Sequence, residues 1–227
     1  MRRKLVKQGQ NALTVTLPRE WCVRNDLKVG DEVEINSEDS ILEISSTGKI
    51  KSKIVTVKID EWTDYLIHRL ITNLYKNGVQ ELHLEFKQKL PTSLINKTLH
   101  DLTIGFELTD IKEKSCIIRA LVVEDEESFN VSTRKCFLLI RQAQEIILED
   151  LKNKKFDSLE EIENLRQSVQ RLTNFSIRLA WREGVPEKKR AHIAAIFSNV
   201  HRYGNRLKDL YSELQYVDQK IVKTLFE

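Results

Sequence analysis

Apolar and polar residues alternate over several short stretches in the first half of the chain. After about residue 130, apolar residues recur mainly every three or four positions. Alternation places side chains on opposite faces of a β-strand, whereas the longer spacing collects them on one face of an α-helix. The pattern therefore predicts an α+β protein, with short strands and helices first and a helical bundle last.

The first 46 residues read as short strands separated by turns. Leu13, Val15 and Leu17 alternate with threonines, and Pro18, which suits the first turn of a helix, ends that strand. A short helix is expected over 19–25, and further strands after the Val29-Gly30-Asp31 turn. The basic stretch at residues 2–7 is expected to form the opening strand.

A unit of this size buries little apolar surface. Below roughly 40 to 60 residues a single core is marginal unless disulfides, a metal or a partner supports it. Residues 1–46 contain one cysteine and no histidine, so neither a disulfide nor a metal site is indicated there. We therefore predict that a second copy of the chain completes this unit in a homodimer.

Residues 50–125 are predicted to form a small α+β domain. Two helical stretches are expected, one capped by Asp60 and one opened by Pro91. The strands are expected at 53–59, 80–86, 105–111 and 115–123, the last two as a hairpin. The order strand, helix, strand, helix, strand, strand is typical of helices packed on one layer of sheet.

Residues 130–227 are predicted to form three long helices joined by short loops. The first is expected over 132–155, and the second from a capping box at Ser158 and Glu161 to Gly184. The third is expected to begin at Pro186 and to continue toward the end of the chain. Three antiparallel helices with short connections predict an up-down-up bundle.

Composition supports a folded chain and excludes several classes of protein. Of the 227 residues, 31% are charged and 41% hydrophobic, with only 7 glycines and 3 prolines. No apolar run approaches the about 18 residues that span a membrane, and no signal peptide is recognised. Cys22, Cys116 and Cys136 are far apart and show no CxxC spacing, so they are expected to be buried apolar residues. A cytoplasmic location without membrane insertion is predicted.

The charge within the first 48 residues is divided. Up to Lys28 there are seven basic residues and two acidic ones, whereas residues 29–48 contain six acidic residues and no basic one. A basic surface of this kind suits phosphate contacts, although an ordinary solvated surface is the alternative. The candidate DNA-binding residues are Arg2, Arg3, Lys4, Lys7, Asn11, Arg19 and Arg24.

No motif in the chain indicates catalysis. There is no nucleophile elbow or glycine-rich phosphate loop, and His68, His83 and His100 have no partners at metal-ligand spacing. These histidines are interpreted as surface or packed residues. The protein is therefore predicted not to be an enzyme, and no cofactor is expected.

The order of elements in residues 1–46 resembles the AbrB/SpoVT swapped-hairpin family of DNA-binding domains. The run from Leu17 to Trp21 and the run from Leu27 to Asp31 carry the resemblance, in particular to an archaeal subgroup with a PhoU-like helical region after this domain. The resemblance implies an interleaved dimeric β-barrel that presents basic residues to DNA. Many relatives carry paired arginines in the short helix, where this chain has Cys22 and Val23, so Arg19 or Arg24 would have to substitute.

The helical third is similar to a single PhoU repeat. The run from Val200 to Arg206 carries this resemblance, with His201 and Asn205 where the family has a metal-binding carboxylate pair. No metal is therefore expected. Asp209 and Glu213 keep the spacing of four residues and stay open as an alternative metal site.

Together these observations predict a homodimeric DNA-binding transcriptional regulator. The PhoU resemblance implies control of phosphate uptake, with the helical region docking a phosphate-transport or signalling protein. The alternative is an interaction or antitoxin-like module in which residues 1–46 only dimerise. The basic residues before Lys28 favour the first hypothesis, and the missing helix arginines keep the second open.

Overall fold

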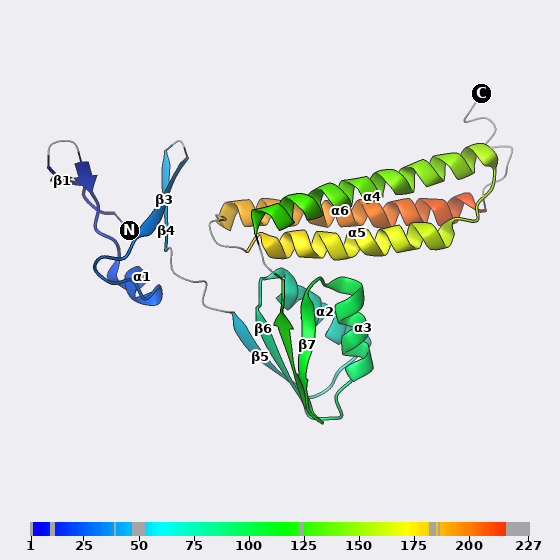
Figure 1. Cartoon of the computed structure of the whole chain (residues 1–227), viewed down its shortest axis with the longest axis horizontal. Coiled ribbons are helices and arrows are strands. Elements are labelled where there is room, and N and C mark those ends of the chain that lie inside the picture. Colours follow the sequence, from blue (N-terminus) through cyan, green and yellow to red (C-terminus); the bar gives the residue numbers. More distant parts are fainter. Residues whose placement is uncertain are drawn as a thin grey trace. The chain divides into compact units, whose positions relative to one another are not determined.

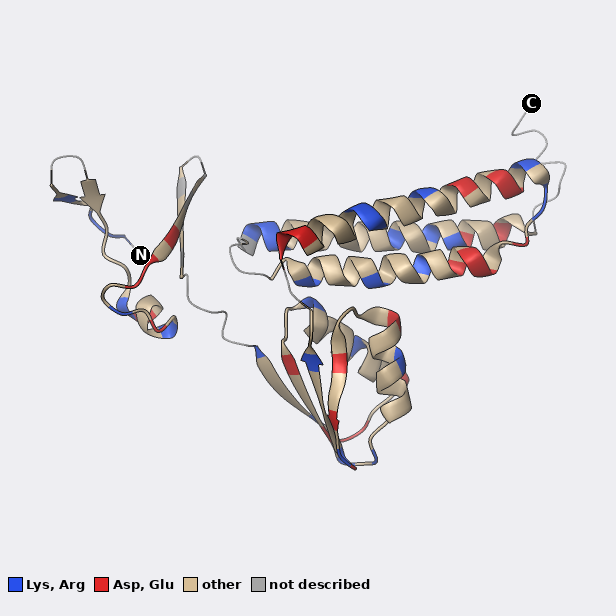
Figure 2. Cartoon of the chain, in the orientation of Figure 1, with Lys and Arg blue, Asp and Glu red and all other residues tan. Residues whose placement is uncertain are grey.

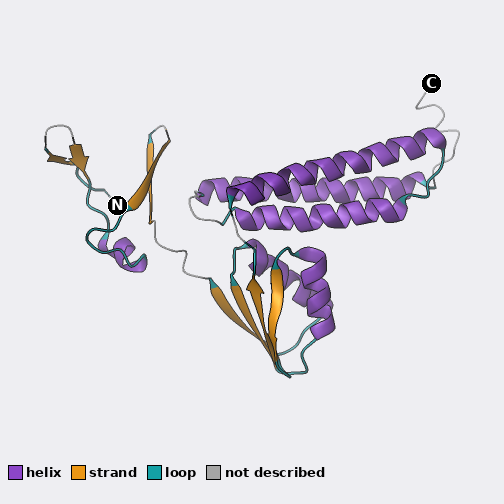
Figure 3. Ribbon diagram, viewed as in Figure 1, coloured by secondary structure: helices purple, strands orange, loops and turns teal. Residues whose placement is uncertain are grey.

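The computed structural model describes residues 2–9, 12–38, 40–46, 53–122, 125–181, 185 and 187–216. The chain divides into two compact units, Met1–Lys51 and Ser52–Glu227, which are described separately. The predicted mixture of strands and helices with a helical C-terminal region is confirmed (Figure 1, Figure 3). Within the described ranges, no helix is both long and apolar enough to cross a membrane.

The first unit consists of two antiparallel hairpins with a short helix between them. Strands β1 (Val6–Gln8) and β2 (Ala12–Thr14) form one hairpin. Strands β3 (Val33–Glu38) and β4 (Ile41–Ser46) form the other, and helix α1 (Arg19–Arg24) lies between them in sequence. The opening strand is shorter than predicted, because it starts at Val6 and leaves Arg2 to Lys4 outside it.

Local hydrogen bonds explain where α1 begins and ends. Pro18 was expected in the first turn of the helix, but it is the N-cap, with extended backbone directly before Arg19. Its carbonyl oxygen accepts from the amides of Trp21 and Cys22, at 3.0 and 3.1 Å. The side-chain amide of Asn25 donates to the carbonyl oxygen of Trp21 at 2.8 Å and satisfies a group in the last turn. A turn then follows, in which the amide of Lys28 donates to the Asp31 carboxylate at 2.7 Å.

The second unit contains a four-stranded sheet in the order β5-β6-β8-β7. Strands β5 (Ile54–Ile59) and β6 (Glu81–Phe86) are parallel, and β8 (Ser115–Ala120) pairs antiparallel with both β6 and β7 (Phe106–Ile111). The predicted order of strands and helices and the β7–β8 hairpin are confirmed.

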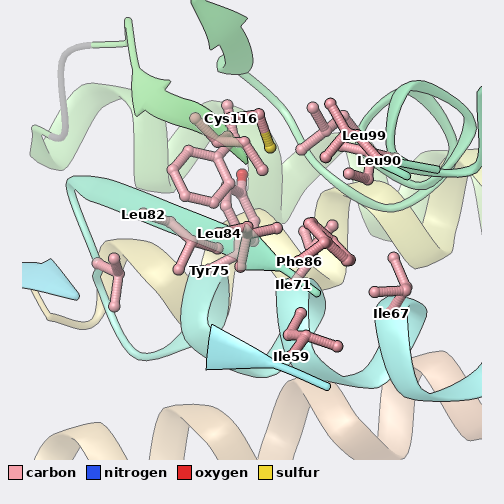
Figure 4. Close-up of a cluster of buried hydrophobic side chains, with 14 of the residues drawn as sticks. Ile59, Ile67, Ile71, Tyr75, Leu82, Leu84, Phe86, Leu90, Leu99 and Cys116 are labelled. Carbon is pink, nitrogen blue, oxygen red and sulfur yellow. The ribbon is translucent and has the colours of Figure 1, made fainter. Parts of the chain in front are cut away.

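Two helices cover one face of this sheet and build its core. Helices α2 (Asp64–Lys76) and α3 (Thr92–Leu102) bury apolar side chains against the strands. Figure 4 shows Ile67, Ile71 and Tyr75 of α2 beside the buried side chains of β5 and β6. The Tyr75 hydroxyl donates to the carbonyl oxygen of Ile104 at 2.9 Å and accepts from its amide at 3.0 Å, so its polar end is satisfied inside the core.

Three helices form the C-terminal region: α4 (Glu126–Asn153), α5 (Leu159–Leu179) and α6 (Glu187–Leu214). Helix α4 begins before the predicted residue 132, because the Asp125 carboxylate accepts from the Ser128 amide at 2.7 Å and caps an earlier turn. Helix α5 ends at Leu179, earlier than predicted. The part of the third predicted helix beyond residue 216 lies outside the described residues.

Two predicted caps are wrong. Thr63, not Asp60, caps α2, and its hydroxyl accepts from the Leu66 amide at 3.2 Å. Ser158 is the residue before α5, but its side chain makes no capping bond. Its amide instead donates at 2.8 Å to the hydroxyl of Tyr211, a buried residue of α6 that also bonds to the Asp150 carboxylate. A tertiary contact therefore replaces the predicted local one.

The sheet and the bundle, which the sequence presents as two domains, share a core in the second unit. Phe175 and Leu179 of α5 belong to the same buried cluster as the side chains of α2 and the sheet. At the last carbonyl groups of α3, Asn174 donates to Leu102 at 2.9 Å and Arg171 to Thr103 at 3.3 Å. Helix α5 thus supplies hydrogen bonds that the end of α3 lacks internally.

Arg178 makes the most buried polar contact between these two parts. It is 1% exposed, and its guanidinium donates to the carbonyl oxygens of Tyr75 and Val79, at 2.9 and 2.7 Å. The same group lies over the Tyr75 and Phe106 rings, with its carbon 4.8 and 5.4 Å from their centroids. Arg178 therefore ties α5 to the sheet layer through both hydrogen bonds and ring contacts.

Candidate nucleic-acid interface

The predicted DNA-binding residues lie at three places in the first unit. Arg2, Arg3 and Lys4 precede β1, Lys7 lies within β1 opposite Leu13, and Arg19 and Arg24 are the first and last residues of α1. All six are exposed. The seventh, Asn11, lies outside the described residues.

The two hairpins differ in charge. Figure 2 shows basic residues on the segment that leads into β1 and on α1, and acidic residues on the segment that enters β3. Asp31 accepts the turn hydrogen bond from Lys28, and Glu32 and Glu34 follow it. Phosphates would therefore be attracted to the side of β1 and α1 and repelled from the start of β3.

Helix α1 carries one basic residue at each end, Arg19 and Arg24, and an acidic residue, Glu20, in its first turn. The Arg24 side chain donates from Nε to the carbonyl oxygen of Glu20 at 3.3 Å, one turn earlier in the same helix. This bond leaves the terminal nitrogens of the guanidinium available for an anion. Between the two arginines, Cys22 is half-buried and Val23 is exposed.

Apolar side chains of the first unit are uncovered. Among the residues of this unit whose burial the structure describes, none is buried. Eight large apolar residues are exposed: Leu5, Val6, Leu13, Val15, Val23, Val29, Ile35 and Leu42. Both hairpins contain only two strands, so each also presents unpaired strand edges.

Arg166 lies next to His201 and Asn205, the residues at the position that resembles the PhoU metal motif. Arg166 of α5 forms a two-pronged ion pair with Glu163, with both N–O distances 2.8 Å, and donates to the Asn205 side-chain oxygen at 3.2 Å. His201 lies 3.3 Å from the Asn205 amide nitrogen. Burial, and then Arg166 and Lys76, lower the pKa of His201. These neighbours disfavour a cation at this position.

Asp209 and Glu213, the alternative metal residues, lie on α6. The Asp209 carboxylate is 3.9 Å from the ammonium of Lys208. Within the described ranges, no group of three or more histidine, cysteine, aspartate or glutamate residues could hold a metal ion.

Three histidines that have no partners at metal-ligand spacing in the sequence form hydrogen bonds in the structure. His68 hydrogen-bonds to Thr98 at 2.7 Å, His83 to Glu81 at 2.5 Å and His100 to Asp101 at 2.9 Å. Sequence spacing does not reveal the contact of His68, since it joins α2 to α3. Alternation along β6 does place Glu81 and His83 on one face.

The three cysteines differ in their burial. Cys116 and Cys136 are buried, which raises the pKa of the first thiol to about 11 and of the second to about 12. Both are therefore poor nucleophiles. Cys22 is only half-buried, so the expectation of a buried residue is not met there.

The open face of the sheet carries a polar network and a shallow cavity. Arg119, and then His83, hold the pKa of the Glu81 carboxyl at about 2. The Arg119 guanidinium donates to that carboxylate at 2.7 Å. Next to this network is a cavity of about 160 Å³. Its polar lining residues are His83, Glu85, Asp110, Lys112 and Ser115.

Comparison with known proteins adds no relative. No family model matches the chain, and no significant match is found among curated proteins or solved structures.

Proposed function

We propose that this protein is a homodimeric DNA-binding transcriptional regulator, in which two copies of residues 1–46 interleave into one β-barrel that holds DNA. The observation that carries the proposal is that no residue of this segment whose burial the structure describes is buried, together with its eight exposed apolar residues. A single chain would leave this apolar surface in water, at a cost of roughly 25 cal/mol for each Å².

A second copy is the partner that supplies matching surfaces. Each chain offers two hairpins with unpaired edges, and strands from two chains can complete each other's ladders and cover each other's apolar faces. The resemblance to the swapped-hairpin family supports this arrangement. A dimer of this kind requires no further domain and no cofactor.

The basic residues support DNA as the ligand. Arg2, Arg3, Lys4, Lys7, Arg19 and Arg24 are all exposed, and a dimer presents each of them twice. Each phosphate that a lysine or arginine neutralises releases condensed counterions, so affinity falls as salt rises. In this proposal the protein acts in the cytoplasm, and the helical region docks a protein of phosphate transport or signalling.

The test is DNA binding measured over a range of salt concentrations. Replacing Arg3 and Lys4 by alanine removes four positive charges from the dimer, and should weaken binding to all sequences and flatten the slope of log affinity against log salt. The matched control replaces Lys87 and Lys89, two exposed lysines of the second unit, by alanine. The control should bind DNA as the parent protein does.

Two results would overturn the proposal. The first is a parent protein that binds no DNA at low salt, and the second is a double variant that binds as tightly as its parent. Either result favours the interaction module, for which the exposed Val23 on α1 offers an apolar contact. Deletion of residues 1–46 tests the dimer separately, because it should greatly weaken self-association.

A further inference from the structure

We propose that the cavity on the open face of the β5–β8 sheet binds a small zwitterion of the free amino-acid class, with the ligand's ammonium group at Asp110 and its carboxylate at Lys112 and Ser115. All the residues that line this cavity belong to the second unit. The inference goes beyond the proposed DNA binding, and its test needs no DNA. In a transcriptional regulator, such a cavity would be the place where an effector binds.

The pairing of the strands arranges the cavity in two neighbouring rows. In the first row, His83 of β6 and Asp110 of β7 both lie opposite Ile117 of β8, so their side chains share the open face. In the next row, the carbonyl oxygen of Ser115 accepts from the amide of Lys112 at 2.8 Å. Asp110 and Lys112 therefore lie two residues apart along one side of the cavity.

An irregularity in β7 brings Asp110 to this face. Phe106 and Leu108 pack into the core of the sheet, so plain alternation would point Asp110 toward the core as well. The pairing of β7 with β8 shifts between Leu108 and Asp110, as at a β-bulge, and Asp110 comes to lie opposite Ile117 instead. Bulges are common next to active sites, where they redirect a side chain. Here the shift adds a carboxylate to the cavity.

The charges of Asp110 and Lys112 have no bonded partner within the fold. Neither side chain forms an ion pair or a hydrogen bond with another described residue, and the two do not pair with each other, although both line the same cavity. Asp110 is half-buried, so its carboxylate has already lost part of its water. A cavity with one carboxylate and one ammonium group that remain unpaired suits a ligand that carries both opposite charges.

Two ion pairs border the cavity and leave its net charge unchanged. The Arg119 guanidinium donates to the Glu81 carboxylate at 2.7 Å, and Asp110 adds only a weaker attraction to it without a hydrogen bond. The Glu85 carboxylate lies 3.6 Å from the Lys58 ammonium. Because each pair is neutral, a ligand without net charge matches the cavity better than a simple cation or anion.

Size and spacing narrow the class of ligand. The cavity measures about 160 Å³, and a cavity of about 150 Å³ holds a molecule of about six carbon atoms. Asp110 and Lys112 are separated by roughly 7 Å of extended backbone, since each residue advances about 3.4 Å. The half-buried Ser115 hydroxyl can donate a further hydrogen bond to a carboxylate. Amino acids from glycine to threonine in size meet these requirements.

The test is a titration of the full-length protein with glycine, L-alanine, L-serine and L-threonine, followed by backbone amide shifts in NMR. At least one of these probes should bind saturably with a Kd on the order of 1 mM, as suits a small ligand in a shallow cavity. The shifts should be largest in β6, β7 and β8. Two analogues of that probe, its amide and the acid that lacks the amino group, should each bind at least about tenfold more weakly.

Two variants assign the two ends of the ligand. Asp110→Asn and Lys112→Gln should each weaken binding of the amino acid about tenfold. Lys112→Gln should also remove the difference between the amino acid and its amide, because the carboxylate has then lost its partner. The matched controls are Glu107→Gln and Lys114→Gln, two exposed residues of the same hairpin outside the cavity lining, which should bind as the parent does. Melting temperatures confirm that all variants are folded.

Three results would overturn this site. The first is the absence of saturable shifts with all four amino acids up to about 20 mM. The second is an amide or a deaminated acid that binds as tightly as the amino acid, because the cavity would then hold a simple cation or anion. The third is equal weakening by the control variants. None of these results bears on the proposed DNA binding, which depends on residues 1–46.

Discussion

The two units of the chain differ in how far their apolar side chains are buried. Ser52–Glu227 has three buried hydrophobic clusters, whereas the described residues of Met1–Lys51 form none. Both units contain strands with alternating apolar residues, so pattern alone does not separate them. The difference is that helices cover one face of the β5–β8 sheet, whereas within the first unit none of the hairpin residues whose burial the structure describes is buried. Similar strand patterns can therefore belong to a self-sufficient fold or to one that needs a partner.

The largest expected effect comes from separating the units. A fragment of residues 1–51 should be unfolded when dilute and should fold only as it associates, because its monomer has no core. Fluorescence of Trp21, the only tryptophan in that fragment, should give a urea midpoint that rises with protein concentration. A urea midpoint that does not change with concentration would show that the fragment folds as a monomer. The first unit would then need no partner, as we expect for the second unit.

Loss of Arg178 should destabilise the second unit strongly. Arg178→Met keeps much of the side-chain volume but removes the donors to Tyr75 and Val79, and should cost about 2–4 kcal/mol of unfolding free energy. Arg171→Met, which removes one bond of 3.3 Å, is the control and should cost clearly less. Equal effects in chemical denaturation would show that the buried arginine is not the main polar link.

A pair of glycine substitutions compares the units at similar backbone geometry. Gly105 and Gly9 have φ angles of 66° and 70°. A Cβ on Gly105 would come within 1.8 Å of the Val122 side chain, whereas one on Gly9 meets nothing within 4 Å. Gly105→Ala should therefore lower the free energy of unfolding by about 2–3 kcal/mol, and Gly9→Ala should lower it by about 1 kcal/mol. If Gly9→Ala lowered the free energy of unfolding more than Gly105→Ala does, the first unit would be packed more closely than a single chain shows.

Gly204→Ala should have a small effect of the opposite sign. A Cβ there would lie 3.4 Å from Val169, which is ordinary contact, and alanine favours a helix interior over glycine. We expect stabilisation by about 0.5–1 kcal/mol in thermal unfolding. A marked decrease in thermal stability would instead mean that α5 and α6 need the glycine for close packing.

The smallest effect should come from acid titration of Glu81. Its folded pKa is lowered to about 2, so its ion pair stabilises the fold above the ordinary pKa of 4.5 and is lost as the pH falls toward 2. Glu81→Gln should be less stable than the parent at neutral pH, and the difference should disappear on acidification. Glu85→Gln, on the same exposed face of β6, serves as the control.

Local patterns predicted the elements better than their ends. Alternation located β5, β6, β7 and β8, and Pro91 marked the start of α3. The capping predictions at Asp60 and Ser158 were wrong because a cap depends on which nearby group reaches the amide. In the second case the competing group is Tyr211, which is 53 residues away. Composition could not reveal that contact.

The exposure of the candidate DNA-binding residues could be predicted from their charge, whereas their role in binding DNA stays a prediction. Arg2, Arg3, Lys4, Lys7, Arg19 and Arg24 are all exposed, as expected for charged groups that avoid the cost of burial. In the proposed regulator, their arrangement around DNA would depend on how two chains pair. The network of Glu81, His83 and Arg119 was missed, since it requires the pairing of β6 with β8.

Local periodicity and residue type were sufficient to predict the class of the fold, the order of its elements and the charge of its N-terminal segment. Tertiary packing brought Phe175 and Leu179 of α5 into the buried cluster of the middle region, because these residues and Arg178 reach groups far away in the chain. It also decided which apolar residues stay uncovered. Alternation shows that a strand has an apolar face, but only packing shows whether the same chain covers it.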